Sequence, residues 1–343
     1  MNKNLKTALK IIVFFAIGIF IFWLAYRGQD IDSMLNAIKN TKWSWIILSL
    51  ILGLIGHYSR GMRWRLLLEP CGYSPRDVNM FSSVMIMYLS NMAIPRSGEF
   101  IRCGITSKYE GIPFAVSFGT VVTERIADML VFLALTIVVF ATQSNIITQI
   151  LNENPSIGER LVEMENNIPW IIAALVILAI AGILAIKFVI KKNIFGIGEK
   201  ISSTIKNFKQ GVFTILKLKK RTQFILHTLF INFVYYFDIY LAFQAFSFTD
   251  HLTASCALTV FVLSTYGVVV PSPGGMGTWH FLAIELLALY GVDKDPDGRA
   301  FALVTHGVQD VTFLIGGFAM LMLLPLINKN YKPKSKNEPV TQN

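Results

Sequence analysis

Long, nearly unbroken blocks of apolar residues are the feature that most constrains this chain. Five blocks are each mostly apolar over about the 17–25 residues that a membrane-spanning helix needs: 11–26, 43–57, 170–190, 223–246 and 300–326. Only 15% of the residues are charged, against about 25% in soluble proteins. A soluble chain of 343 residues could not bury so many helices that are apolar on every side. The sequence therefore predicts an all-α, polytopic integral membrane protein.

Lysine and arginine residues gather in some of the loops between these blocks. The N-terminal segment and the stretches 60–77 and 187–221 are basic, whereas 143–168 and 293–299 are acidic. Short basic loops face the cytoplasm. We therefore expect a cell-membrane protein with both termini in the cytoplasm, and we expect 143–168, 247–253 and 293–299 outside. The net charge of +10 fits this topology and anionic lipid headgroups, and no pattern typical of nucleic-acid binding appears.

Counting crossings between these loops predicts segments that enter the membrane and return on the same side. Two apolar stretches, 78–95 and 114–142, separate an inside loop from an outside loop, so only one of them can cross fully. We expect 114–142 to cross and 78–110 to be re-entrant. Charge does not separate two spans from a hairpin over 252–292, and we favour the hairpin by analogy. The prediction is a bundle of about six full spans and two re-entrant hairpins.

The two re-entrant segments are followed by helices with a similar pattern of polar residues. The first of these helices carries Glu124 and Asp128, and the second carries His306 and Asp310. In both helices the two side chains lie four residues apart and so share one face. Because the units enter from opposite sides, the sequence suggests an inverted-topology repeat. Broken helices in such repeats mark a substrate site near the midplane.

Proline and glycine residues break both re-entrant segments at membrane depth. Proline stops a helix and cannot donate a backbone hydrogen bond, whereas glycine permits positive φ. Such breaks are tolerated in hydrocarbon where they line a cavity. The residues expected at the breaks, lining a cavity, are Asn91, Pro95, Gly98, Pro271, Pro273, Gly274, Gly275 and Gly277. Asn91 either stabilises the first break by hydrogen bonds or is an ordinary polar packing residue. A helix that starts after a break favours an anionic phosphate.

Charged side chains accompany these breaks. An isolated charge at mid-bilayer costs on the order of 3 kcal/mol, so such residues pair with each other and mark pathways. The candidate substrate-binding residues are Arg96, Glu99, Arg102, Glu124, Arg125, Asp128, His306 and Asp310. A purely structural cluster remains open, in which Glu99 pairs with Arg102. Glu124 would then pair with Arg125 or a neighbouring arginine.

Other polar residues near the spans have open interpretations. Asp238, within the apolar block 223–246, is either functional or structural, and His306 either relays a proton or packs in the interior. The polar end of the second span, predicted as 43–59, is interpreted as an interfacial anchor at the cytoplasmic face. This anchor consists of His57, Tyr58, Arg60, Arg63 and Arg65.

Motifs that would indicate a soluble enzyme are missing from the sequence. There is no Walker A, HExxH or GxSxG pattern, so we expect no catalytic residues, cofactor or metal, and we favour a transporter over an enzyme. An intramembrane enzyme stays open because the paired acids and His306 are able to do acid–base work. Residues 1–327 are expected to form one transmembrane domain. Residues 328–343 are expected to be a basic, disordered cytoplasmic tail.

Three motifs occur in a characteristic order. They are Asn91-Met-Ala-Ile-Pro95-Arg96-Ser97-Gly98-Glu99-x-x-Arg102, then Glu124-Arg125-x-x-Asp128, then Pro271-x-Pro273-Gly274-Gly275-x-Gly277. Together they resemble the lysylphosphatidylglycerol synthase transmembrane domain family, also called the flippase-like or UPF0104 family, over roughly residues 10–327. The resemblance implies a multi-pass cell-membrane protein. In the best-known relatives this domain moves aminoacylated phosphatidylglycerol between leaflets and is fused to an aminoacyl-transferase domain that we do not find here.

We therefore expect a lipid flippase or translocase that moves an anionic or aminoacylated phospholipid, or a related lipid carrier, between leaflets. The expected partners are membrane lipids, with a second copy of the chain or a separate lipid-synthesising enzyme as further partners. A membrane-embedded lipid-modifying enzyme, an accessory subunit and a small-solute transporter remain alternatives. A cavity sealed from the lipid would favour a solute, and a lateral opening would favour a lipid.

Overall fold

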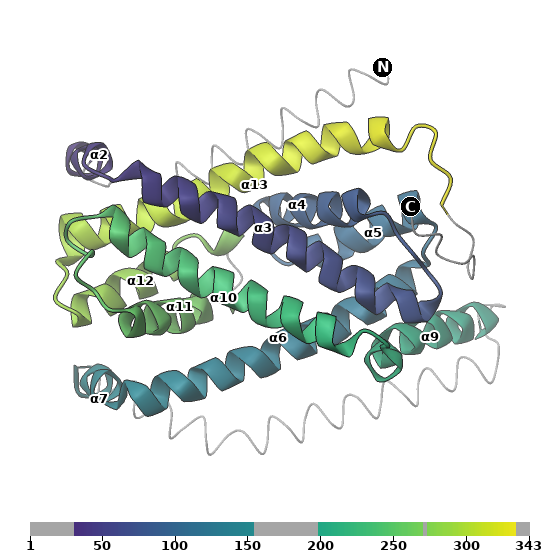
Figure 1. The fold of residues 1–343 in the computed structure, drawn as a ribbon, viewed down its shortest axis with the longest axis horizontal. Coiled ribbons are helices and arrows are strands. Elements are labelled where there is room, and N and C mark those ends of the chain that lie inside the picture. The colour runs from purple at the N-terminus through teal and green to yellow at the C-terminus, as the bar shows by residue number, and fades with distance from the viewer. Residues whose placement is uncertain (1–30, 154–197, 270–272, 334–343) are drawn as a thin grey trace.

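Every regular element in the described part of the chain is a helix (Figure 1). The computed structural model describes residues 31–153, 198–269 and 273–333. The predicted spans 11–26 and 170–190, together with Pro271 and the tail 334–343, lie outside the described residues. The all-α prediction is confirmed. Apolar blocks in hydrocarbon fold this way because a helix satisfies its backbone hydrogen bonds within one segment.

Four long helices form the frame of the molecule. They are α3 (Trp43–Leu68), α6 (Phe114–Thr142), α10 (Arg221–Ala245) and α13 (Arg299–Ile327). With 25 to 29 residues each, they are long and apolar enough to cross a membrane. At a rise of about 1.5 Å per residue they exceed the roughly 30 Å of a hydrocarbon core. Each coincides with a predicted span, so the polytopic architecture is confirmed.

Helix α3 continues to Leu68, past its predicted end at residue 59. Arginine is a good helix former, and the helix ends only at the proline-containing turn η1 (Glu69–Cys71). Arg60, Arg63 and Arg65 are therefore helix residues, and the prediction that they begin a loop is wrong.

Two helical hairpins lie between the long helices. The first consists of α4 (Asp77–Ala93) and α5 (Gly98–Glu110), and the second of α11 (Ala254–Val269) and α12 (Thr278–Leu289). Within each hairpin the two helices pack along each other. Helices α5 and α12 have only 13 and 12 residues, or about 20 and 18 Å, which is too short to cross. Hairpins thus form in both predicted places, including 252–292, where charge alone left two spans open.

The remaining helices mark the two ends of the bundle. They are α2 (Ile31–Lys39), α7 (Ser144–Glu153), α9 (Gly198–Val212), η3 (Phe213–Lys217) and η5 (Lys294–Gly298). In Figure 1, α2 and α7 lie at the left end and α9 lies at the right end. Lys42 pairs with Asp250 at 2.9 Å on the left, and Lys220 pairs with Glu69 at 3.0 Å on the right. Loops that were predicted to lie on the same side of the membrane therefore lie at the same end of the helix bundle. Which end faces the cytoplasm stays a prediction.

The two hairpins enter from opposite ends. At the right end, the Asn79 side-chain amide donates to Glu110 Oε1 at 2.5 Å and so joins the first helix of hairpin one to its second. At the left end, the Tyr290 hydroxyl donates to Gln143 Oε1 at 3.2 Å, next to the base of the second hairpin. Both tips therefore point into the middle of the molecule.

The helices of the two halves correspond in order and in length. Helices α3 to α6 have 26, 17, 13 and 29 residues, and α10 to α13 have 25, 16, 12 and 29. Their packing is reciprocal, because α4 packs against α13, α11 packs against α6, and α3 lies along α10. Helices α3 and α10 run in opposite directions in Figure 1. These features support the predicted inverted repeat.

The interiors of the two halves differ in chemistry. The second half contains the larger apolar core, in which Phe243, Phe246 and Phe301 are buried. The first half buries a cluster of arginines and carboxylates, among them Arg102 and Glu124. The polar interior of the first half faces the hairpin tips and is described next.

Candidate functional site

The tip of the first hairpin is a tight backbone break. Arg96 has a positive φ of 65°, which is rare for a residue other than glycine. The Gly98 N–H that begins α5 donates to Asn91 Oδ1 at 2.7 Å, so of the two interpretations of Asn91 the structure favours a hydrogen bond across the break. A Cβ on Gly98 would lie 2.4 Å from the carbonyl oxygen of Met87. Only glycine lets the two helices approach this closely.

The tip of the second hairpin is built on glycine. Three glycines have φ values of 61°, 84° and 84°: Gly274, Gly275 and Gly277. The described part of this tip includes η4 (Pro273–Gly275), which packs against α4. An Arg96 guanidinium nitrogen donates to the Val268 carbonyl oxygen at 3.4 Å. The two breaks therefore meet, although they are far apart in sequence.

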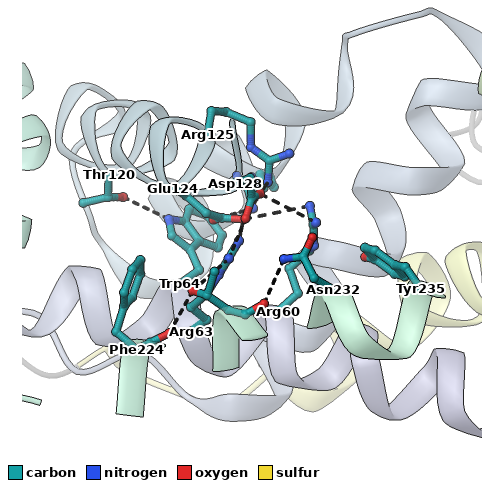
Figure 2. Close-up of polar contacts among 12 residues, drawn as sticks. Arg60, Arg63, Trp64, Thr120, Glu124, Arg125, Asp128, Phe224, Asn232 and Tyr235 are labelled. Atoms are coloured by element: carbon teal, nitrogen blue, oxygen red, sulfur yellow. Dashed lines mark hydrogen bonds and ion pairs between the residues drawn. The ribbon is translucent and has the colours of Figure 1, made fainter. Parts of the chain in front are cut away.

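A cluster of charged side chains lies at the centre of α6 (Figure 2). Glu124 is fully buried, and its carboxylate lies 3.0 Å from Arg63 Nη2 and 3.1 Å from Arg102 Nη1. Its contact with Arg125 Nη2 is 2.7 Å, so this predicted pair is confirmed. Asp128, one turn later, lies 2.5 Å from Arg63 Nη1. The purely structural alternative paired Arg102 with Glu99. In the structure Arg102 pairs with Glu124, because its side chain extends from α5 toward α6.

Two arginines of α3 belong to this cluster, which corrects their interpretation as an interfacial anchor. Arg60 and Arg63 are only 7% and 0% exposed, and Arg60 Nη2 lies 3.7 Å from Asp128. Residues three apart share one face of a helix, and this face of α3 packs against α6. Arg65 points elsewhere and pairs with Asp77 near the end of the bundle.

Positive charge exceeds negative charge in this cluster. Its four arginines share two carboxylates, so the cluster has a formal net charge of +2. Arg102 is fully buried, and its Nε and Nη2 atoms make no hydrogen bond with the described residues. Its guanidinium lies over the Trp64 ring, 4.5 Å from the centroid. Because buried charges are costly unless paired, the cluster favours the approach of an anion.

A cavity of about 530 Å³ lies between the hairpin tips and the four long helices. The predicted site residues that line it are Asn91, Pro95, Arg96, Glu99, Arg125, Asp128, Gly274, Gly275 and His306. Other predicted residues do not line it: Gly98, Arg102, Glu124, Pro273, Gly277 and Asp310. Arg102 and Glu124 instead lie in the ion cluster behind the wall formed by Arg125 and Asp128.

The cavity reaches the surface on the side of the bundle. Met129 and Val268 both line it, yet they are 71% and 44% exposed. Met129 lies near the middle of the 29-residue α6, and Val268 lies near the tip of the second hairpin. Among the described residues, the opening is therefore lateral and at the depth of the hydrocarbon core, far from both ends of the bundle.

The half of the cavity nearer the second hairpin carries titratable side chains. His306 Nδ1 lies 2.9 Å from Asp310 Oδ2, and the rings of His306 and His280 are 4.7 Å apart. Asp238 lines the cavity from α10 and accepts a hydrogen bond from the Ser49 hydroxyl at 3.1 Å. Among the described residues, no three His, Cys, Asp or Glu side chains gather as metal ligands would.

Several cavity residues were not selected from the sequence. His57, interpreted there as part of the anchor, is buried, and its ring lies 4.7 Å from that of Tyr88. Tyr88 and Tyr235 both line the cavity, and their hydroxyl groups form a hydrogen bond of 3.0 Å. The spacing of Arg60 and Arg63 could have indicated their role. Two arginines three residues apart share one helix face and can pair with Glu124 and Asp128, which share a face of another helix. No local pattern distinguishes the tyrosines from ordinary packing residues.

The fold and the site define a multi-pass helical membrane protein with two opposed, broken hairpins. The chain belongs to the lysylphosphatidylglycerol synthase TM region family, which it matches over residues 9–317. It is also 26% identical over 326 residues to the UPF0104 membrane protein MJ1595 of Methanocaldococcus jannaschii, covering 89% of this chain and 92% of the relative. No solved structure matches the chain.

Proposed function

We propose that this protein moves a lipid with an anionic, phosphate-bearing headgroup between the leaflets of the cell membrane. The observation that carries the proposal is a cavity that, among the described residues, opens laterally and is backed by an ion cluster in which four arginines share two carboxylates. The headgroup enters this cavity, and the acyl chains stay in the surrounding hydrocarbon.

The chemistry of the wall suits a phosphate. Arg60 and Arg125 line the cavity, and Arg96 reaches it from the first hairpin tip. A guanidinium keeps its charge at every physiological pH and offers paired N–H donors to two phosphate oxygens. The Asp128 carboxylate holds the guanidinium groups of Arg60 and Arg125 in place without cancelling the charge of both. A headgroup phosphate bound here would compensate part of the net positive charge of the ion cluster.

The shape of the site favours a lipid over a small solute. A solute transporter needs a cavity that opens toward the ends of the bundle, whereas this cavity opens beside Met129, at mid-depth. The meeting point of inverted, broken hairpins is also where secondary transporters place their substrate. Rocking of one half against the other would expose the same cavity to either leaflet.

Family membership supports the same substrate class. The family is named for the membrane region of a lysylphosphatidylglycerol synthase, and an aminoacylated phospholipid, an ordinary anionic phospholipid and a phosphorylated lipid carrier all present a phosphate. We place the basic end that carries α9 and η3 in the cytoplasm, together with both termini, by the positive-inside rule. A lipid-synthesising enzyme or a second copy of the chain is the protein partner we propose.

Reconstitution into liposomes tests the proposal. The purified protein is inserted into vesicles that contain fluorescent phosphatidylglycerol, aminoacylated phosphatidylglycerol, a polyprenyl phosphate or phosphatidylcholine, and exchange between leaflets is followed by quenching. We expect faster exchange of the phosphate-bearing anionic lipids. Equal exchange with and without protein for the whole panel would refute the proposal. A new lipid species in the mass spectrum would indicate lipid modification instead.

A matched pair of variants on one helix sharpens the test. Arg60→Gln removes a guanidinium that lines the cavity, whereas Arg65→Gln removes one that pairs with Asp77 near the end of the bundle. A hydrogen bond to a charged group contributes about 1.5–3 kcal/mol, so we expect Arg60→Gln to slow exchange about ten- to a hundredfold. Arg65→Gln should leave the rate within about twofold of the wild type. Equal effects of the two variants would contradict the assigned site.

A further inference from the structure

Asp238 differs from the other buried carboxylates of the molecule. It lies on α10, is 4% exposed and lines the cavity. The acids of the ion cluster are held by arginines, and Asp310 is held by His306. Glu110 makes no ion pair with a described residue either, but it lies near the end of the bundle and accepts hydrogen bonds from Asn79 and Tyr331. Asp238 makes no ion pair with any described residue, and its Oδ1 accepts one hydrogen bond, from Ser49. Its other oxygen lies over Gly53, where a Cβ would be 3.5 Å away.

Among the described residues, the helices packed against α10 place no cation in an ion pair with Asp238. Tyr88, Arg96 and Glu99 also line the cavity, from the first hairpin. The charged and titratable side chains that line the cavity from α10 itself and the helices packed against it are His57 and Arg60 from α3, Arg125 and Asp128 from α6, Tyr235 from α10 and His306 from α13. Helix α11 contributes none. Arg60 and Arg125 are already paired with Asp128, and His306 is paired with Asp310.

An isolated carboxylate at this depth is costly, whereas the neutral acid is not. Arginines cannot release a proton in a protein, so the four arginines of the ion cluster keep their charge throughout a transport cycle. Asp238 combines burial at membrane depth, the lack of a cationic partner and contact with the substrate cavity. It is therefore the carboxyl group best placed to bind and release a proton as the cavity opens and closes.

We propose that the Asp238 carboxyl binds a proton that accompanies the anionic headgroup through the cavity, so that the protein is a proton–lipid symporter. This inference rests on the proposed function. The proton binds a carboxylate oxygen on the side with more protons and leaves it on the other side, and no covalent bond changes elsewhere.

The sign of the coupling follows from electrostatics. An anion in the cavity repels the ionised form of Asp238 and so favours its protonated form. By reciprocity, a proton on Asp238 strengthens binding of the anion by the same factor. Proton and headgroup therefore bind together and travel together. One proton and one singly charged lipid make a neutral cargo, which the membrane potential does not oppose.

A transport experiment tests the coupling in liposomes with a fluorescent phosphatidylglycerol and a pH difference of one unit, with the membrane potential clamped at zero. The equilibrium distribution does not depend on how the protein is oriented in the vesicle. For one proton per lipid, we expect about tenfold more labelled lipid in the leaflet that faces the alkaline side. Exchange by the wild type without any asymmetry would overturn the inference and leave the proposed function standing.

Three variants identify the group responsible. Asp238→Asn replaces the carboxyl by an amide that has no proton to release, and its leaflet ratio should stay near one. Asp238→Glu should restore asymmetry. Asp250→Asn, an exposed acid beyond the end of the same helix that pairs with Lys42, should keep the wild-type ratio. Persistent asymmetry in Asp238→Asn would overturn the assignment.

A binding experiment in detergent separates this inference from transport itself. The soluble headgroup analogue glycerol 3-phosphate is titrated into the protein at several pH values. We expect its affinity for the wild type to rise as the pH falls, even after correction for the ionisation of the analogue. The affinity for Asp238→Asn should not change beyond that correction. If the wild type and this variant respond alike, the proton site is refuted, whatever the liposome result.

Discussion

Replacing Glu124 by glutamine would keep the shape of the side chain but remove the charge that four arginines share. The carboxylate lies within 3.1 Å of nitrogen atoms of Arg63, Arg102 and Arg125 and 3.9 Å from Arg60. Glu124 is fully buried, so solvent does not screen these contacts. Loss of one partner from a buried ion pair costs about 3–5 kcal/mol, because the remaining charge is left uncompensated. We expect Glu124→Gln to lower the free energy of unfolding by that amount.

The measurement is reversible unfolding in detergent–lipid micelles, compared with two other acid-to-amide variants. Asp128→Asn should cost less, because its side chain is 20% exposed and partly hydrated. Asp250→Asn, in a pair with side-chain exposures of 51% and 36%, should cost at most about 1 kcal/mol. A loss of less than about 1 kcal/mol in Glu124→Gln would show that the cluster is not electrostatically buried.

A double variant checks the physical reason. Arg102→Met removes a buried cation whose ion pair is with Glu124. In the Glu124→Gln background, this second change should restore part of the lost stability, because it removes an uncompensated charge. In the wild-type background it should destabilise the protein. Strictly additive effects would contradict the reasoning, since residues in contact are expected to couple by about 0.5–3 kcal/mol.

Two further predictions concern helix packing and the right-hand end of the bundle. Gly119→Ala should destabilise the protein by about 1–3 kcal/mol in thermal unfolding, because the new Cβ would lie 2.3 Å from a carbonyl oxygen of α9. Gly104→Ala is the control, because no atom lies within 4 Å of a Cβ added there. It should be neutral or slightly stabilising. Burial raises the pKa of Glu110, which accepts a hydrogen bond from Tyr331 after α13 at 2.8 Å. A carboxyl with a raised folded pKa contributes stability at low pH that is lost as the pH rises through that value, so the thermal unfolding temperature should fall as the pH rises. Glu110→Gln should remove this response, and an unchanged response would contradict the link.

Much of the architecture was predictable because hydrocarbon leaves the backbone few choices. Apolar blocks such as 114–142 must be helices, and α6 has the predicted bounds. Charge parity between loops required the first re-entrant segment, and the proline and glycine residues located its break. The choice of a hairpin over 252–292 rested only on analogy. The structure supports it because α12 is too short to cross.

The partners of the charges were much less predictable. The sequence placed Glu124 and Asp128 on one face and paired Glu124 with Arg125, since these residues are neighbours on one helix. It did not predict that Arg63 belongs to the same cluster. Arg63 lies far from Glu124 in the sequence and reaches it only because α3 packs against α6. An arginine near the end of an apolar block resembles an interfacial anchor until the true end of the helix is known.

The sequence by itself determined that this protein resides in a membrane, where its helices lie, where the two hairpins break and which residue types occur at their tips. These features depend on local hydrophobicity and backbone chemistry. Only the tertiary structure decided that the two tips meet, that four arginines share two acids in the ion cluster, and that Asp238 faces the cavity without a cationic partner among the described residues. Whether a buried charge is compensated depends on distances across helices, and composition and spacing along one chain do not contain those distances.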